Sequence, residues 1–296
     1  MNKPQTAKGI LYALGAYLIW GLAPIYFKSI QYVPPDEIVS HRVIWSVFFM
    51  VLMLTVTRHW RQAWVVVRQP KILLLLGFTA FTITSNWLTY IWAVNNNHLL
   101  EASLGYFINP LVSVLLGMMF LGERFRRIQW IAVALAFTGV LIQVVQFGSV
   151  PVIGLYLATT FAVYGLIRKK LGVDAQTGML IETVWVFPVA LNYLLFFTDS
   201  PTSNMLDNTY SLNLMLIAAG IITTVPLLLF TAAAAHLRLS TLGFFQYLGP
   251  TIMFLLATLV YGEKIGPDRL ITFGFIWAAL ILFTLDALYT QRRLRK

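Results

Sequence analysis

Ionisable side chains inside apolar runs are the residues of this sequence that could carry chemistry. Arg42 follows His41 in EIVSHRVIWSVFF, and Glu182 lies in QTGMLIETVWVFP. A charge at the centre of a membrane span costs roughly 2.5–3.5 kcal/mol on insertion scales, so such residues usually have a function. We expect Arg42 to attract an anionic substrate group, and Glu182 or His41 to exchange protons. The alternatives are snorkelling of Arg42, a structural hydrogen-bond acceptor at Glu182 and a plain polar contact at His41.

Amide and aromatic side chains gather near the middle of other apolar runs. Asn86 and Tyr90 are one helical turn apart and share a helix face, with Trp87 beside them. Aromatic walls with a few amides commonly hold small ligands, although ordinary helix packing is the alternative for each residue. The predicted substrate-binding residues are Trp20, Arg42, Asn86, Trp87, Tyr90, Tyr106, Asn109, Tyr164 and Gln246.

Catalytic and metal-binding patterns are missing from the sequence. It contains no H-E-x-x-H, G-x-S-x-G or P-loop pattern, no cysteine, and only four histidines, which are not spaced as metal ligands on one helix. We therefore expect no catalytic residue, no metal, no other cofactor and no ATP-driven step. A membrane-embedded enzyme acting on lipid and a scaffold are the alternatives to transport.

The composition indicates that these residues belong to an integral membrane protein. Hydrophobic residues make up 59% of the 296 positions and charged residues only 11%, against about 25% charged in an average soluble domain. A membrane helix needs about 20 apolar residues. We expect an all-α integral membrane protein with ten spans, at 10–27, 38–57, 72–96, 103–121, 129–147, 152–167, 177–197, 212–236, 241–261 and 270–289.

The basic residues set the expected orientation of these spans. The net charge is +10, and if the N-terminus is cytoplasmic, seventeen Lys and Arg fall on that side and three on the other. This excess is typical of cytoplasmic loops, so both termini are expected there. We do not expect nucleic-acid binding, because most aromatic residues lie inside the apolar runs and not beside the bases.

One pattern occurs twice in the chain. NPLVSVLLGMMFLGER and GPTIMFLLATLVYGEK place Pro110 and Pro250 140 positions apart, and the same offset aligns Trp45 with Trp185. Each Gly-Glu exit by itself is typical of a helix end. The offset across several spans predicts a duplication into residues 1–147 and 148–296. Because five spans is an odd number, the second half would be inverted, as in many secondary transporters.

Several stretches are similar to a known family: LIWGLAPIYFK, EIVSHRVIWS, WAVNNNHLLEASLGYFINPLVSVLLGMMFLGERF and LRLSTLGFFQYLGPTIMFLLATLVYGEK. They resemble the EamA family of the drug/metabolite transporter superfamily. The resemblance implies two inverted five-helix halves in the bacterial inner membrane. It also implies export of small metabolites or drugs, often amino-acid-like, through a cavity lined by the first, third, fourth, sixth, eighth and ninth helices.

These observations combine into one hypothesis of function. We expect a secondary-active exporter of small amino-acid-like or amphipathic compounds that works by alternating access, with protons as the coupling ion. A passive facilitator of the same fold is the alternative. The expected partners are a small-molecule substrate, membrane lipids and protons, and the chain is expected to be a monomer or a weak homodimer.

Overall fold

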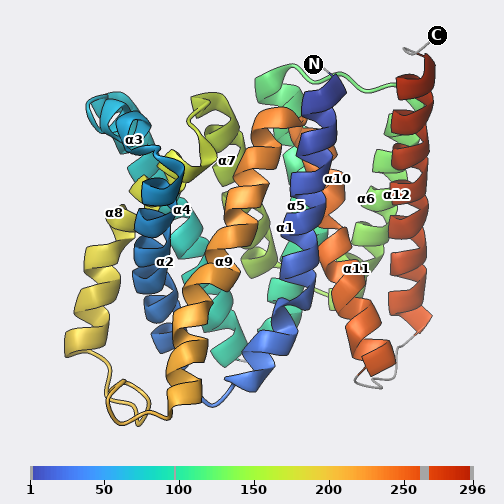
Figure 1. Ribbon diagram of the computed structural model, residues 1–296. Helices are drawn as coiled ribbons and strands as arrows, with labels where there is room; N and C mark the ends of the chain where they lie inside the picture. The colour runs from blue at the N-terminus through green and yellow to red at the C-terminus, as the bar shows by residue number, and fades with distance from the viewer. Residues whose placement is uncertain (1–2, 97, 261–266, 294–296) are drawn as a thin grey trace. The chain divides into compact units, whose positions relative to one another are not determined.

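The computed structural model describes residues 3–96, 98–260 and 267–293, and every regular element in these ranges is a helix. Nine of the helices in the described part are long and apolar enough to cross a membrane. The chain therefore forms a multi-span helical protein (Figure 1). The helices are α1 (Lys3–Ser29), α2 (Pro35–Thr57), α3 (Trp60–Val67), α4 (Pro70–Asn95), α5 (Leu99–Leu121), α6 (Arg127–Phe147), α7 (Val152–Leu171), α8 (Ala175–Phe196), α9 (Tyr210–His236), α10 (Leu239–Gln246), α11 (Leu248–Leu255), a π-helical turn η1 (Leu256–Val260) and α12 (Pro267–Arg293).

The helices differ from the expected spans in three places. α3 lies in the basic stretch that was expected to be a loop, and its side chains are mostly exposed. The expected span 241–261 is divided into α10, α11 and η1. The expected last span, 270–289, lies within α12, but the apolar stretch described there, Leu270–Asp286, is shorter than the nine candidate spans, so the tenth span stays a prediction. Residues 261–266, which include the second Gly-Glu exit, lie outside the described residues.

The helices form two compact units, each built from separate stretches of the chain. The first unit comprises Met1–Ile91 and Ile167–His236, and the second comprises Trp92–Leu166 and Leu237–Lys296. Each unit thus draws helices from both halves of the sequence. The predicted halves 1–147 and 148–296 are defined by the sequence repeat, and the two packing units do not test that division.

In the first unit, α2 packs against both α8 and α9, and α1 packs against α9. The helices α2 and α8 are antiparallel. Thr57 at the end of α2 donates to Gln176 at the start of α8 (2.8 Å), while Tyr193 near the end of α8 donates to Asp36 at the start of α2. Small residues allow the close contact with α9, since a Cβ at Gly220 would lie 2.6 Å from the carbonyl carbon of Trp45.

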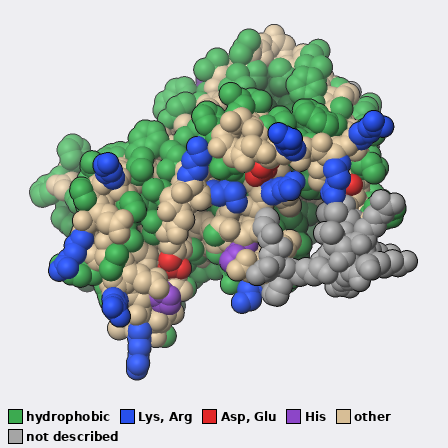
Figure 2. Space-filling view, turned by 90° about the horizontal axis from the view of Figure 1, so that it is seen from above, with side chains coloured by type: hydrophobic (Ala, Val, Ile, Leu, Met, Phe, Trp, Pro, Cys, Tyr) green, Lys and Arg blue, Asp and Glu red, His purple; other side chains and the backbone are tan. Residues whose placement is uncertain are grey.

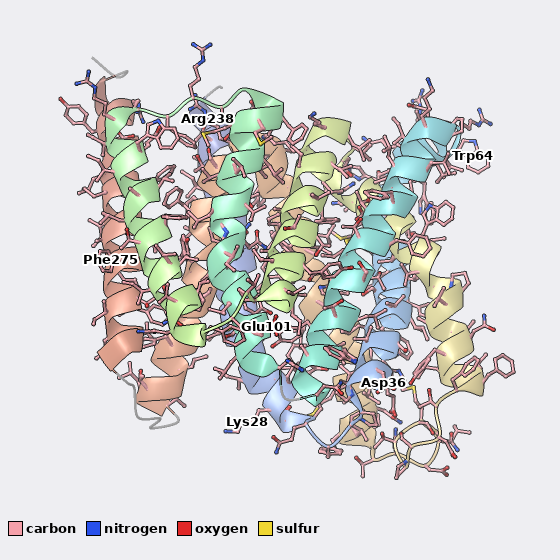
Figure 3. The ribbon with its side chains drawn as sticks, turned by 180° about the vertical axis from the view of Figure 1, so that it is seen from behind. Lys28, Asp36, Trp64, Glu101, Arg238 and Phe275 are labelled. Atoms are coloured by element: carbon pink, nitrogen blue, oxygen red, sulfur yellow. The ribbon has the colours of Figure 1, made fainter. Side chains whose placement is uncertain are left out.

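The two ends of the first unit differ in charge. Exposed Lys and Arg lie near the start of α1, at the end of α2, along α3 and at the start of α4. We call this end of the first unit the basic end. Figure 2 looks onto this end and shows Lys and Arg side chains among apolar ones. Asp36 lies at the opposite end from Trp64 of α3 (Figure 3). We call that opposite end, with Asp36, Glu37, Asp199 and Asp207, the acidic end.

In the second unit, α5 packs against α10, and α6 packs against α12. Both pairs are antiparallel. Glu123, directly after α5, accepts from the backbone N–H of Leu239 at the start of α10 (2.6 Å), and Arg126, directly before α6, donates to Asp286 late in α12. Glu101 and Arg238 lie at opposite ends of this unit (Figure 3). Its core includes Val114, Ala132, Ala136, Phe244, Tyr247, Ile276, Ala279 and Phe283.

Candidate functional site

Arg42 and Trp87, two of the predicted substrate-binding residues, are in contact within the first unit. The Arg42 guanidinium lies over the Trp87 ring, 3.9 Å from its centroid. A guanidinium stacked on an indole is held by a cation–π interaction, and its planar N–H groups match the geometry of a carboxylate or phosphate. Both side chains, Arg42 on α2 and Trp87 on α4, are half-buried. The pair can therefore bind a carboxylate or phosphate group.

The other predicted binding residues of the first unit have different surroundings. Trp20 of α1 packs between Tyr17 (5.5 Å between ring centroids) and Phe230 of α9 (6.0 Å). Asn86 is buried and Tyr90 is half-buried, one turn apart on α4. Trp20 thus belongs to an aromatic group on α1 and α9, while Asn86, Trp87 and Tyr90 belong to α4.

In the second unit the structure joins Asn109 and Gln246 through a serine. Ser113 of α5 donates to Asn109 Oδ1 (3.2 Å), and Gln246 Nε2 of α10 donates to Ser113 Oγ (3.4 Å). All three side chains are buried, so these hydrogen bonds satisfy groups that water cannot reach. The close approach of α10 depends on Gly243, where a Cβ would lie 2.9 Å from the Pro110 carbonyl oxygen. The cluster offers amide and hydroxyl groups to a polar ligand.

Tyr106 and Tyr164, the remaining predicted binding residues, are not part of this cluster. Tyr164 of α7 is completely buried beside Phe161 (6.2 Å between ring centroids), as expected of a packing residue. Tyr106 of α5 has 41% of its surface exposed within the described structure. The roles of Tyr106 and Tyr164 in substrate binding stay predictions.

Glu182, a predicted proton-coupling residue, is held by two partners in the first unit. Arg168 Nε of α7 lies 3.5 Å from Glu182 Oε1, and Thr79 Oγ1 of α4 donates to the same oxygen (2.6 Å). The two charged side chains are 1% and 2% exposed. These are contacts that a structural acceptor at Glu182 would make, and its role in proton coupling stays a prediction.

His41, the other predicted proton-coupling residue, is also buried in α2. Its Nε2 atom is inaccessible and makes no hydrogen bond with the described residues. The neighbouring helix α9 meets α2 one turn further on, where Thr224 donates to Ser46 (2.5 Å) and Ser46 donates to the Gly220 carbonyl (3.2 Å). His41 therefore lies in the helix interface and not on an exposed surface.

The groove found in the second unit is of a different kind. It follows α5, α6 and the start of α7, has a volume of about 860 Å³, and is lined almost entirely by apolar side chains. Such a lining suits hydrocarbon better than a polar metabolite. It contains none of the predicted binding residues, and its wall includes Leu111, Leu115, Val133, Phe137, Leu141 and Val145.

Comparison with known proteins decides the family. Residues 7–145 match the EamA-like transporter family. The chain is 62% identical over 296 residues to Protein RarD of Escherichia coli (strain K12), covering 100% of both chains. It is 55% identical to an uncharacterized transporter of Vibrio cholerae, covering 100% of this chain and 98% of that one. This chain belongs to the EamA-like transporter family.

Family membership and the apolar helices together identify a multi-pass membrane protein of a transporter family, not an enzyme. A solved crystal structure has a similar fold, with a TM-score of 0.74 at 20% sequence identity, covering 94% of this chain and 98% of that chain. At this identity the likeness concerns the fold alone.

Sequence reasoning missed Arg168, which it assigned to the cytoplasmic surface with Lys169 and Lys170. The structure buries Arg168, and Gly178 makes the space, since a Cβ there would lie 1.8 Å from Arg168 Nη1. The signal in the sequence was Gly178, near the start of a helix that carries one acidic residue, Glu182. Ser113 and Thr79 were missed because hydroxyl residues are common in membrane helices and only contacts distinguish them.

Proposed function

We propose that this transporter is a secondary-active exporter of small amphipathic or amino-acid-like metabolites in the bacterial inner membrane. The proposal is carried by two sets of side-chain contacts in a repeated helical frame, one with an anion-binding group and one with amide groups. Arg42 stacked on Trp87 would bind an anionic group in the first unit. Asn109 and Gln246, joined through Ser113, would offer polar contacts in the second unit. We propose two binding surfaces, one in each unit.

The proposed inverted repeat, which is common among alternating-access transporters, is supported by the helix boundaries. Four pairs of helices begin 140 positions apart: α2 and α8 at Pro35 and Ala175, α4 and α9 at Pro70 and Tyr210, α5 and α10 at Leu99 and Leu239, and α6 and α12 at Arg127 and Pro267. Within their units, three of these pairs are antiparallel, namely α2 with α8, α5 with α10, and α6 with α12. Antiparallel packing of equivalent helices is what an inverted duplication produces.

One contact joins two equivalent residues directly. Tyr247 Oη donates to the backbone carbonyl of Phe107 (3.2 Å), and these residues are also 140 positions apart. A residue meets its own equivalent only near a two-fold axis. We therefore place a pseudo-two-fold axis of the repeat close to this contact in the second unit. We propose ten spans, with the basic end of the first unit in the cytoplasm, on the distribution of Lys and Arg.

The first test is transport by purified protein in liposomes. Vesicles would contain a mixed pool of amino acids and related metabolites, and mass spectrometry would identify compounds that leave faster than from protein-free vesicles under an imposed pH difference. Exit that depends on the pH difference supports a proton-coupled exporter. Loss of that exit in a folded Arg42→Ala variant supports the stacked arginine as the anion contact, whereas wild-type rates in this variant contradict it.

A passive facilitator is the second candidate. It is favoured by the ion pair of Glu182 with Arg168, because a carboxylate held by an arginine is poorly placed to release and bind protons. Exit of the same compounds at rates independent of the imposed pH difference would support the facilitator. Absence of exit for every compound in the pool would count against both candidates.

A further inference from the structure

Helix α2 carries three unsatisfied polar atoms on one side. Glu37 Oε1, His41 Nε2 and Trp45 Nε1 are all inaccessible, and none of them hydrogen-bonds within the described residues. The residues are four positions apart, so they lie on successive turns separated by about 6 Å along the helix axis. Buried polar groups in proteins are almost always satisfied. Three exceptions in a row, starting at the acidic end of the first unit, point to a ligand that moves along this side of α2.

Glu37 differs from the other buried acids of the spans. Its side chain is fully buried, and its Oε2 atom accepts from Ser200 Oγ (2.5 Å) and Thr202 Oγ1 (3.1 Å) in the loop 197–209. Glu182 and Asp286 each contact an arginine and Glu101 contacts His98, whereas Glu37 forms no ion pair in the described part of the chain. No cation among the described residues therefore competes with a proton at Glu37.

His41 lies one turn beyond Glu37, and its imidazole nitrogen can accept and release a proton. Its Nε2 and the Glu37 Oε1 are the two unsatisfied atoms of α2 nearest the acidic end. One proton held between them, directly or through one water, would satisfy both. Side chains four positions apart on one helix face are neighbours, so a proton bound by one of these groups affects proton binding by the other.

The surroundings of the pair contain few other charges. On α2 itself, Asp36 accepts from Tyr193 of α8, and Arg42 is stacked on Trp87 of α4. Tyr26 of α1 interacts electrostatically with Arg42. The contacts that α9 makes with this part of α2 are apolar or hydroxyl in kind, from Leu212, Leu216, Gly220 and Thr224.

We propose that Glu37 and His41 form one coupled proton-binding pair, and that protons exchange here and not at Glu182. The proposal rests on the secondary transport proposed above. The step is a proton transfer in which the Glu37 Oε1–H bond breaks as the His41 Nε2–H bond forms. A proton from water at the acidic end then restores the Oε1–H bond, and His41 returns its proton to water when the transport cycle exposes it. Trp45 Nε1 would donate to water one turn deeper.

The test is an infrared pH titration of the protein in phosphatidylcholine liposomes without any substrate. The carbonyl stretch of a protonated carboxyl group reports Glu37 directly. We expect a pH-dependent band in the wild type that is absent in Glu37→Gln. In His41→Gln we expect the midpoint of this band's titration to move by about one pH unit, because an interaction of that size defines a coupled pair. The double variant Arg168→Met, Glu182→Met removes the rival carboxyl and retains the band.

Each other outcome overturns the pair. A band that persists unchanged in Glu37→Gln, a midpoint that stays in place in His41→Gln, or a band lost in the double variant would each do so. If Glu37→Gln does not fold, Glu37→Asp retains a carboxyl group that cannot reach the same position, and its midpoint must differ from that of the wild type. Because no substrate is present, this result does not depend on the proposed function.

The driving role of the pair is tested by flux. In the liposome assay, exit from wild-type vesicles follows the imposed pH difference, and in His41→Gln vesicles we expect that dependence to be lost while exit continues. Wild-type exit that ignores the pH difference would overturn proton exchange as the coupling step, even if the pair titrates. Absence of exit with an intact infrared titration would instead count against the proposed function.

Discussion

The buried pair of Arg168 and Glu182 gives the sharpest prediction of stability. Their side chains are 1% and 2% exposed, and three helices meet there, since Arg168 is on α7, Glu182 on α8 and Thr79 on α4. Replacing Glu182 with Gln leaves the Arg168 charge buried without its partner. Breaking a buried ion pair in this way costs roughly 3–5 kcal/mol. With about 2–4 °C per kcal/mol for a chain of a few hundred residues, the melting temperature should fall by on the order of 10 °C.

The assay is thermal unfolding of the purified protein in detergent, followed by intrinsic fluorescence. The double variant Arg168→Met, Glu182→Met removes both charges and fills the space with apolar atoms, so it should be more stable than either single variant. Lys170→Gln is the matched control, because Lys170 lies two residues further along α7 and is exposed. It should change the free energy of unfolding by no more than about 0.5 kcal/mol.

Two results would refute this reasoning. One is a Glu182→Gln variant with the wild-type melting temperature, which would mean that the pair is not buried as the structure has it. The other is a double variant that loses the sum of the two single losses, because independent sites add and coupled sites do not. The stability of the double variant also decides whether it can serve as the control in the infrared titration.

Three further predictions follow from close contacts. Gly178→Ala should lower the free energy of unfolding by about 1–3 kcal/mol, because its Cβ would lie 1.8 Å from Arg168 Nη1. Gly274→Ala is its control: a Cβ there has nothing within 4 Å, so this variant should not be destabilising in the same melting assay. Glu123→Ala should lower it by about 0.5–2 kcal/mol, since Glu123 accepts from two backbone N–H groups at the start of α10, and hydrogen exchange at Leu239 and Ser240 should increase. Arg42→Lys should reduce transport by about as much as Arg42→Ala if stacking on Trp87 and a planar donor edge are what the substrate needs, and wild-type transport by Arg42→Lys would contradict that.

The spans were predictable because a membrane imposes a length and a composition that few other folds share. The helix starts follow the repeat so closely that the 140-residue offset found in the sequence recurs at α2 and α8 and at α5 and α10. The division of the ninth span was not predictable from hydropathy. Its pieces are all apolar. The break at Tyr247 precedes a Gly-Pro pair, and the equivalent helix α5 has Asn109 and Pro110 there in a continuous helix.

The site was less predictable because a sequence shows which charges enter a span but not which of them meet. Arg42 and Glu182 occupy equivalent positions in the two halves, and both were singled out for their charge. The structure separates their surroundings, with an indole face beside Arg42 and a guanidinium beside Glu182. Glu37 was passed over because an acid in the first turn of a helix is usually explained by the helix dipole.

In the proposed inverted repeat, equivalent positions with opposite charges also bear on how transport acquires a direction. If both halves carried the same residues, the two orientations of the protein would be equal in energy and neither face would be preferred. The equivalents of Lys28 and Arg42 are Arg168 and Glu182, so one half places two cations where the other forms a buried ion pair. Glu37, likewise, has Thr177 at its equivalent position in the second half. A carboxyl group that binds protons at one end of the first unit, with only a hydroxyl at the position related by the repeat, would make proton binding favour one orientation, and this asymmetry is what a coupled exporter needs.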